Sequence, residues 1–224
     1  MKNHRKISLT AGWLYVLTFV SIPTLALYTH VKSANYILGS GSDTPAIIGG
    51  ILEIIVALAG IGTAVVLFPV LKKQNESASL ALVAARILES STIFVGVAFL
   101  LTIVTLHTSG AGANSLPVSH ILSALYDRIF LLGQSFMPAI CDLLLGFMLY
   151  KSRLVPKRLS MIGIVGGPIL LASYFAVMFG LLGQHDGLAG LSAFPVAIFE
   201  FSLGVWLIVK GFDPKAVAVL ASKE

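Results

Sequence analysis

Charged side chains and cysteine are both scarce in this chain of 224 residues. Asp, Glu, Lys and Arg together make up 11% of the sequence, while hydrophobic residues make up 57%. So little polar surface does not cover a soluble globular protein, and a mean hydropathy of +0.94 indicates a protein that lies in lipid. The single cysteine, Cys141, excludes an intramolecular disulfide and any paired-cysteine metal or redox motif.

Motifs for several well-defined chemistries are also missing. The sequence has no G-x-S-x-G, no G-x-x-x-x-G-K-[ST] and no G-x-G-x-x-G, so a nucleophile elbow, nucleotide hydrolysis and dinucleotide binding lack support, and we expect no cofactor. The net charge of +5 is carried by short segments between apolar runs. Orientation in a membrane accounts for it better than nucleic-acid binding does.

The sequence does contain long apolar runs. Six of them approach or exceed the roughly 20 residues that a helix needs to cross a bilayer. We therefore predict an all-α polytopic membrane protein, a bundle of six transmembrane helices that forms one domain over residues 1–224. The expected spans are 7–31, 46–71, 80–106, 120–150, 160–182 and 188–209.

Two of these runs leave alternatives open. The first follows a short basic head and competes with a secretory signal, but a signal has an apolar region of about 7–15 residues and a small-residue cleavage site, so we expect a retained span. The fourth run would extend about 46 Å as a helix, against a hydrocarbon core of about 30 Å. It must tilt, break near Pro138 or extend beyond the bilayer.

The basic residues predict the orientation of the chain. With the N-terminus inside, 12 of the 15 basic residues fall on the cytoplasmic side, Lys32 falls outside, and two arginines lie within or beside spans. The positive-inside rule therefore predicts that both termini are cytoplasmic. The twelve are Lys2, Arg5, Lys6, Lys72, Lys73, Lys151, Arg153, Lys157, Arg158, Lys210, Lys215 and Lys223.

Polar residues inside the spans are the candidates for function. Each charged group at mid-membrane costs roughly 2.5–3.5 kcal/mol on insertion scales, so these side chains should face protein or water. Two bases do not neutralise five acids, so we expect the remaining carboxyls to be protonated, solvated in a cavity or matched by a bound cation. The predicted intramembrane polar cluster is Arg86, Glu89, Asp142, Glu200, Glu53, Gln134, Asp127 and Arg128.

Arg86 and Glu89 are the centre of this prediction. Their i,i+3 spacing allows them to pair on one helix face, and Asp142 on the inner half of the fourth span is an alternative partner. Arg86 also lies near the inner end of its span, from which it could snorkel to the interface. We expect an inner-leaflet cluster of these three residues, with Glu53 and Glu200 in the middle and outer part of the bundle, neutral or in a polar cavity.

Polar pairs recur every seven residues along the fourth span, close to two full helical turns, so they share one stripe. Pro138 on the same side leaves the carbonyl of Gln134 without its helical partner, free to bind a side chain, water or ligand. The alternative is that the outermost pair lies at the outer interface, where charge costs little. The pairs are Asp127-Arg128, Gln134-Ser135 and Cys141-Asp142.

Small residues accompany the acids at helical spacing. Gly49, Ala57, Gly60 and Ala64 share a face with Glu53, which favours a close helix contact. The sixth span repeats this pattern, with Ala193, Ala197 and Gly204 on the face of Glu200. The fifth span has the small-xxx-small pair Gly163 and Gly167 just before Pro168, for which tight helix packing is the simpler interpretation.

Four histidines map to the outer ends of spans or to outer loops. They could converge on a metal, but no pair has the i,i+4 spacing of a helical zinc motif and nothing resembles H-E-x-x-H. Separate interfacial partners are the better prediction. The four are His30, His107, His120 and His185.

Three segments carry a resemblance to a known family. They run from Arg86 to Glu89, from Leu154 to Ser160, and from Phe199 to Phe212. They resemble the bacterial DUF4386 family of uncharacterised multi-pass integral membrane proteins, and the likeness covers nearly the whole chain. The resemblance implies six helices in a bacterial cytoplasmic membrane and offers no established activity or catalytic residues.

Three classes of function fit these observations. The first is binding or transport of a small molecule, cation or proton through the polar cluster. The second is a membrane-embedded enzyme that acts on a lipid-like substrate, which a metal or a close carboxyl pair beside a lipid-width groove would favour. The third is an accessory subunit whose glycine faces pack against a partner. The expected partners are the lipid bilayer, a small-molecule or lipid ligand, and a second copy or another membrane protein.

Overall fold

The computed structural model describes residues 2–222 as a helical bundle, with no strand in this part of the chain. Six of its helical segments are long and apolar enough to cross a membrane, which confirms the predicted all-α membrane architecture. Of the residues assigned to the cytoplasmic side, Lys223 lies outside the described residues. The six segments are Asn3–Leu27, Thr44–Leu71, Glu76–Thr108, Ala113–Ser152, Lys157–Met178 and Gly187–Val209.

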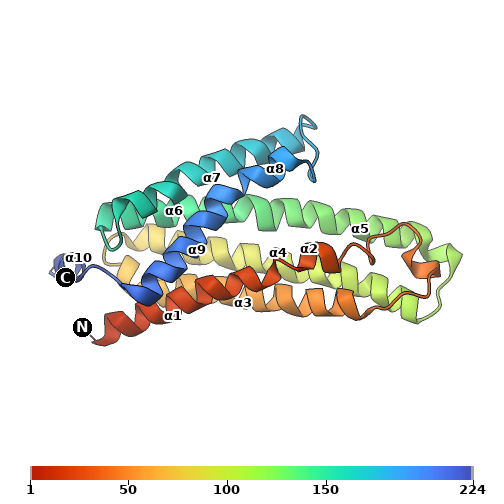
Figure 1. Cartoon of the computed structure of the whole chain (residues 1–224), viewed down its shortest axis with the longest axis horizontal. Helices are drawn as coiled ribbons and strands as arrows, with labels where there is room; N and C mark the ends of the chain where they lie inside the picture. Colours follow the sequence, from red (N-terminus) through yellow and green to blue (C-terminus); the bar gives the residue numbers. More distant parts are fainter. Residues whose placement is uncertain (1, 223–224) are drawn as a thin grey trace.

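Several of these segments consist of more than one helix (Figure 1). The elements are α1 (Lys2–Thr18), η1 (Phe19–Ser21), α2 (Thr24–Leu27), η2 (Tyr36–Leu38), α3 (Thr44–Leu71), α4 (Glu76–Thr108), η3 (Ala113–Ser115), α5 (Leu116–Phe130), η4 (Leu131–Phe136), α6 (Met137–Ser152), α7 (Lys157–Met178), α8 (Gly187–Ser192), α9 (Phe194–Val209) and α10 (Pro214–Ala221).

The first apolar run is not the continuous helix that its length predicts. The α-helix ends at Thr18, a single 3-10 turn follows, and the short α2 begins only after Pro23. Proline has no N–H to donate, so Pro23 does not form the backbone hydrogen bond that would continue the α-helix. The break leaves the segment around η1 available to line a pocket.

The fourth run is interrupted by a π-helical turn, η4, which ends shortly before Pro138. The whole run has 40 residues, about 60 Å at 1.5 Å per residue, so it exceeds a hydrocarbon core of about 30 Å. In Figure 1, α5 extends well past the ends of α7 and α8. The run therefore changes to π-helical geometry just before Pro138 and projects beyond α7 and α8. A π turn widens the helix locally and is frequent at functional sites.

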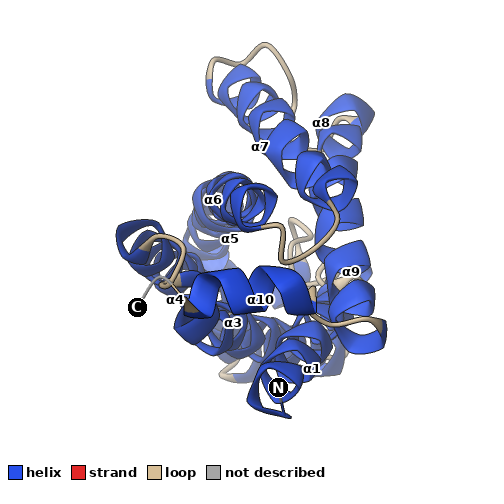
Figure 2. Cartoon of the chain, turned by 90° about the vertical axis from the view of Figure 1, so that its left-hand side faces the viewer, coloured by secondary structure: helices blue, strands red, loops and turns tan. Residues whose placement is uncertain are grey.

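Each long helix packs against at least two others. α1 lies against α3 and α9, α4 contacts α3, α5 and α6, and α7 lies against α6 and α9. Both termini are at one end of the bundle (Figure 1), and α10 lies across that end (Figure 2). α9 crosses the bundle obliquely between α1 and α7 (Figure 1), and this path sets the position of Glu200.

Glycines bring these helices into close contact. A Cβ added at Gly12 of α1 would lie 2.7 Å from the carbonyl oxygen of Gly204 in α9. A Cβ at Gly163 of α7 would meet the Phe199 ring at 2.7 Å, and one at Gly167 would meet the Ala139 carbonyl of α6 at the same distance. The small residues of the fifth and sixth spans thus set how closely α7 and α9 approach their neighbours.

Valine at Gly167 is expected to destabilise the protein. The new side chain would collide with the backbone of α6, which is unable to move aside as a side chain would, so the free energy of unfolding should fall by about 1–3 kcal/mol. Gly190→Val is the matched control, because that exposed glycine has nothing within 4 Å of its Cβ position. Unfolding in detergent measures both; equal losses would mean that the α6–α7 contact is not tight.

Candidate functional site

Arg86 lies on the buried face of α4. The side chain of Asn75 caps the start of this helix by accepting a hydrogen bond from the Ala78 N–H at 2.9 Å, which fixes where its first turn begins. Three turns further on, Arg86 is only 3% exposed. Because the guanidinium is enclosed by protein, the snorkelling alternative is wrong.

The Arg86 guanidinium contacts carboxyl groups from three helices. Its Nη1 donates to both oxygens of Glu89, at 3.2 and 3.0 Å, and its Nη2 donates to Oε1 of Glu200 in α9. Oδ1 of Asp142 in α6 lies 3.8 Å from Nη2. These four residues form what we call the Arg86 cluster, which unites α4, α6 and α9.

The position of Glu200 corrects the sequence-based expectation. We expected Glu200 to lie apart from Arg86, in the middle or outer part of the bundle with Glu53. Instead the two side chains form an ion pair. α9 crosses the bundle obliquely (Figure 1), and this path depends on non-local contacts such as that of Gly163 with Phe199.

The Arg86 cluster has more acid than base. If all three carboxyls were ionised, their charge would exceed that of the guanidinium by two. Asp142 is fully buried, and neither of its carboxyl oxygens has a hydrogen-bond partner among the described residues. The Cys141 thiol donates weakly to Glu89 at 3.7 Å, and the Tyr15 ring lies 5.9 Å from the guanidinium carbon. Uncompensated charge in such a site is expensive, so the cluster requires a proton or a cation.

A pocket of about 220 Å³ reaches the Arg86 cluster. Its polar wall is formed by Arg86, Glu89 and Glu200, and Gln134 lies at another wall. Its remaining walls are largely apolar, and the break in the first span contributes to them. These wall residues are not among the predicted site residues. The signal in the sequence was Pro23, which indicates a break in the first span. The apolar walls include Phe19, Ile22, Val56, Ile93, Leu170 and Val196.

Glu53 forms a second buried polar group, apart from the Arg86 contacts. Its Oε1 accepts hydrogen bonds from the Tyr126 hydroxyl at 2.9 Å and from the Gln134 amide at 3.3 Å, while its Oε2 has no partner among the described residues. Tyr28 packs edge-on against Tyr126. Gln134 belongs to the π turn η4 and also lines the pocket, so it lies between Glu53 and the pocket.

Asp127 and Arg128 lie apart from both buried groups. Asp127 forms an ion pair with Lys32, and its carbonyl accepts a hydrogen bond from the Gln184 side chain at 2.9 Å. Arg128 is exposed. The outermost polar pair of the fourth span therefore does not join the buried polar groups. Of the eight predicted residues, four therefore meet at Arg86, two at Glu53 and two at neither.

The histidines make separate contacts at the end of the bundle opposite the termini. Nδ1 of His107 lies 2.7 Å from Asp43 and its Nε2 lies 2.9 Å from the Gly39 carbonyl, while Nε2 of His120 lies 2.8 Å from the Ala34 carbonyl. No group of three His, Cys, Asp or Glu residues in the described part of the chain could hold a metal ion. His185 is exposed in the turn before α8.

Tyr36 sits beside two of these histidines. Its ring centroid is 5.1 Å from that of His30 and 4.8 Å from that of His107, and its hydroxyl donates to Asp43. Burial, and secondly this hydrogen bond to a carboxylate, raise the pKa of Tyr36 well above its usual value, so the hydroxyl remains a donor. These contacts fasten the segment between α2 and α3 to the end of α4.

Comparison with known proteins gives the chain a family but no activity. No curated protein and no solved structure matches it. A family described as Domain of unknown function (DUF4386) matches residues 10–211, from the first span to the end of the sixth, and so includes all four residues of the Arg86 cluster. The chain therefore belongs to the DUF4386 family of membrane-spanning helical proteins, as its sequence resemblance indicated.

Proposed function

We propose that this membrane protein binds a small amphipathic cation in the pocket beside Arg86, in exchange for a proton carried by Asp142. The observation that carries the proposal is the meeting of one guanidinium with the buried carboxyls of Glu89 and Asp142 and the partly buried carboxyl of Glu200. Arg86, Glu89 and Glu200 line the pocket, and Asp142 lies behind them. Surplus acid in a buried site is balanced by a proton or by a cation. A site that can alternate between the two couples binding of one to release of the other.

A proton balances the charge of the Arg86 cluster better than a metal ion does. The guanidinium already occupies the space among the carboxyls, with Glu89 at 3.0 Å and Asp142 at 3.8 Å, so it would repel a metal cation placed there. Asp142 is the proton carrier in this proposal, because it is fully buried and its contact with the guanidinium, at 3.8 Å, is the longest of the three.

The walls of the pocket define the ligand class. Glu89 and Glu200 give one acidic pole, and the apolar side chains opposite suit a hydrocarbon body. The volume of about 220 Å³ is below the range of drug-sized ligands, roughly 300–1,000 Å³, so the ligand is small. When such a cation pairs with Glu200, Arg86 turns to Asp142, which then releases its proton, and the net charge of the cluster is unchanged.

The distribution of basic residues supports an orientation in the membrane. The end of the bundle that holds both termini carries most of the basic residues, and the positive-inside rule assigns such an end to the cytoplasm. We therefore propose a bacterial cytoplasmic membrane protein with both termini inside. Its outer end is then the one that carries Lys32, Asp127 and the histidines.

Titration calorimetry of the purified protein with tetraethylammonium tests the exchange. We expect a binding heat that depends on the ionisation enthalpy of the buffer, because about one proton leaves for each cation bound. Glu200→Gln should weaken binding at least tenfold, since it removes the carboxylate that the cation needs. Removing one partner of a buried charge pair typically costs more binding free energy than a tenfold loss of affinity represents.

Glu76→Gln is the matched control for this experiment. It removes the same charge from the same helix as Glu89, but Glu76 is exposed in the first turn of α4. The variant should bind tetraethylammonium and release protons as the wild type does. Binding without buffer dependence, or equal weakening by Glu76→Gln and Glu200→Gln, would contradict the proposal.

A further inference from the structure

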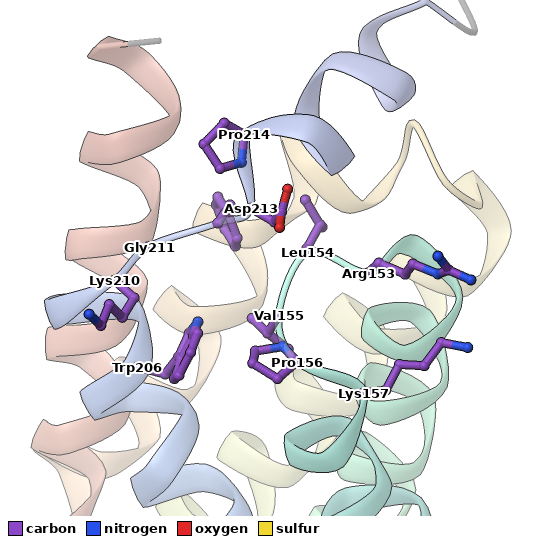
Figure 3. Close-up of a pocket in the computed structure, with 11 residues that line it drawn as sticks. Arg153, Leu154, Val155, Pro156, Lys157, Trp206, Lys210, Gly211, Asp213 and Pro214 are labelled. Atoms are coloured by element: carbon purple, nitrogen blue, oxygen red, sulfur yellow. The ribbon is translucent and has the colours of Figure 1, made fainter.

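A second cavity, of about 610 Å³, lies at the end of the bundle that holds both termini. It is bounded by the turn between α6 and α7 and by the turn between α9 and α10 (Figure 3). Leu154, Val155, Pro156 and Phe212 give it an apolar floor, beside the indole of Trp206. The cavity is separate from the Arg86 cluster and shares no residue with its pocket.

The rim of this cavity is basic. Lys210 stands on one side and Arg153 and Lys157 on the other, and the charged ends of all three side chains point away from the cavity (Figure 3). The only acid at the rim, Asp213, is engaged by α10, whose Lys215 and Ala216 N–H groups donate to its Oδ1 at 2.8 and 3.1 Å. The rim therefore has a surplus of positive charge.

Two of these cations also lack partners inside the protein. Arg153 and Lys210 make no side-chain hydrogen bond or ion pair with any residue in the range 2–222, whereas Arg5 on α1 donates to the carbonyls that end α9. Lys157 only packs over the Tyr150 ring, at 4.6 Å. The basic rim is thus free to bind an anion from outside the chain.

Arg153 occupies an unfavourable backbone conformation. Its φ of 57° is the only positive value for a non-glycine residue between residues 2 and 222, and it ends α6 at the position where helices commonly use glycine. Arginine there costs conformational energy that glycine would avoid.

We infer that this cavity binds the headgroup of an anionic phospholipid. The glycerol and upper acyl carbons would lie against the apolar floor, and the phosphate would lie at the mouth of the cavity, where the long basic side chains turn toward it. Trp206, on the membrane-spanning α9, has the amphipathic ring that lies at the level of lipid headgroups. Basic residues at a membrane surface attract anionic lipid in the same way. The match of an apolar floor to a cationic rim favours a lipid over a soluble anion.

Native mass spectrometry of the full chain in mild detergent tests this inference. With equal amounts of dioleoyl phosphatidylglycerol and dioleoyl phosphatidylcholine, the wild type should retain the anionic lipid preferentially. Arg153→Gly should weaken that retention about fivefold, the effect expected for one basic residue near a membrane surface. It should not lower the unfolding midpoint, because glycine relieves the left-handed backbone conformation. Lys210→Ala, which leaves the backbone unchanged, should weaken retention to a similar extent.

Lys72→Ala is the matched control. Lys72 is an exposed lysine at the same end of the bundle, packed over Phe68 and not part of the cavity, so its removal should leave retention unchanged. Equal retention of both lipids, or equal loss with Lys72→Ala, would overturn the inference. Displacement of the lipid by inorganic phosphate at millimolar concentration would overturn it as well, because the site would then be one for a soluble anion.

Discussion

Arg86→Leu is expected to lower the free energy of unfolding by about 3–5 kcal/mol, the typical cost of leaving a buried charge without its partner. The substitution would leave Glu89, Asp142 and Glu200 facing one another without a cation. Repulsion between the ionised carboxylates, together with the loss of their buried counterion, makes this a severely destabilising change. Unfolding of the detergent-solubilised protein, followed by circular dichroism, measures the loss.

A control variant and a double variant test whether the loss of stability comes from the Arg86 cluster. Lys72→Leu removes a basic residue that is exposed at the end of α3, and it should change the free energy of unfolding by no more than about 0.5 kcal/mol. Adding Glu89→Gln to Arg86→Leu removes one of the stranded carboxylates and should recover part of the loss. Equal effects of the two basic substitutions, or no recovery in the double variant, would show that Arg86 does not hold the cluster together.

Asp142→Asn is expected to abolish proton release on cation binding without lowering the stability of the protein. Arg86 keeps its two closer partners, Glu89 and Glu200, so the loss of this carboxyl should not lower the unfolding midpoint. Proton release on binding of tetraethylammonium should nevertheless disappear, because the amide has no proton to give. The contrast is with Glu200→Gln, which removes a direct partner of Arg86 and should lower the midpoint by several degrees.

Thermal unfolding and the buffer dependence of the binding heat, measured on the same preparations, check this prediction. A large loss of stability in Asp142→Asn would mean that Asp142 serves as a structural counterion to Arg86. Full proton release from that variant would mean that another carboxyl carries the proton. Either result would contradict the role proposed for Asp142, whereas the wild type and Glu76→Gln provide the reference for both measurements.

Local spacing was sufficient to predict the core of the candidate site. The i,i+3 interval between Arg86 and Glu89 predicted their pairing, and the stripe along the fourth span predicted that Asp142 would face inward. The six spans followed from apolar length alone. These features depend on the geometry of a single helix, which sequence periodicity reports directly.

The remaining features depend on packing between helices that are distant in sequence. Glu200 reaches Arg86 because α9 crosses the bundle obliquely, and no period within residues 194–209 encodes that angle. The π turn that aims Gln134 at Glu53 also could not be derived from spacing. Pro23 did signal a break in the first span, but the sequence analysis treated the run as continuous, so the pocket walls were missed.

Infrared spectroscopy of the purified protein at neutral pH tests the central claim, that a carboxyl of the Arg86 cluster carries an exchangeable proton. We expect the stretching band of a protonated carboxyl in the wild type and in Glu76→Gln, a weaker band in Asp142→Asn, and a band in the wild type that weakens to the same extent when tetraethylammonium binds. A band of equal strength in Asp142→Asn, or one that does not change with the cation, would contradict the claim.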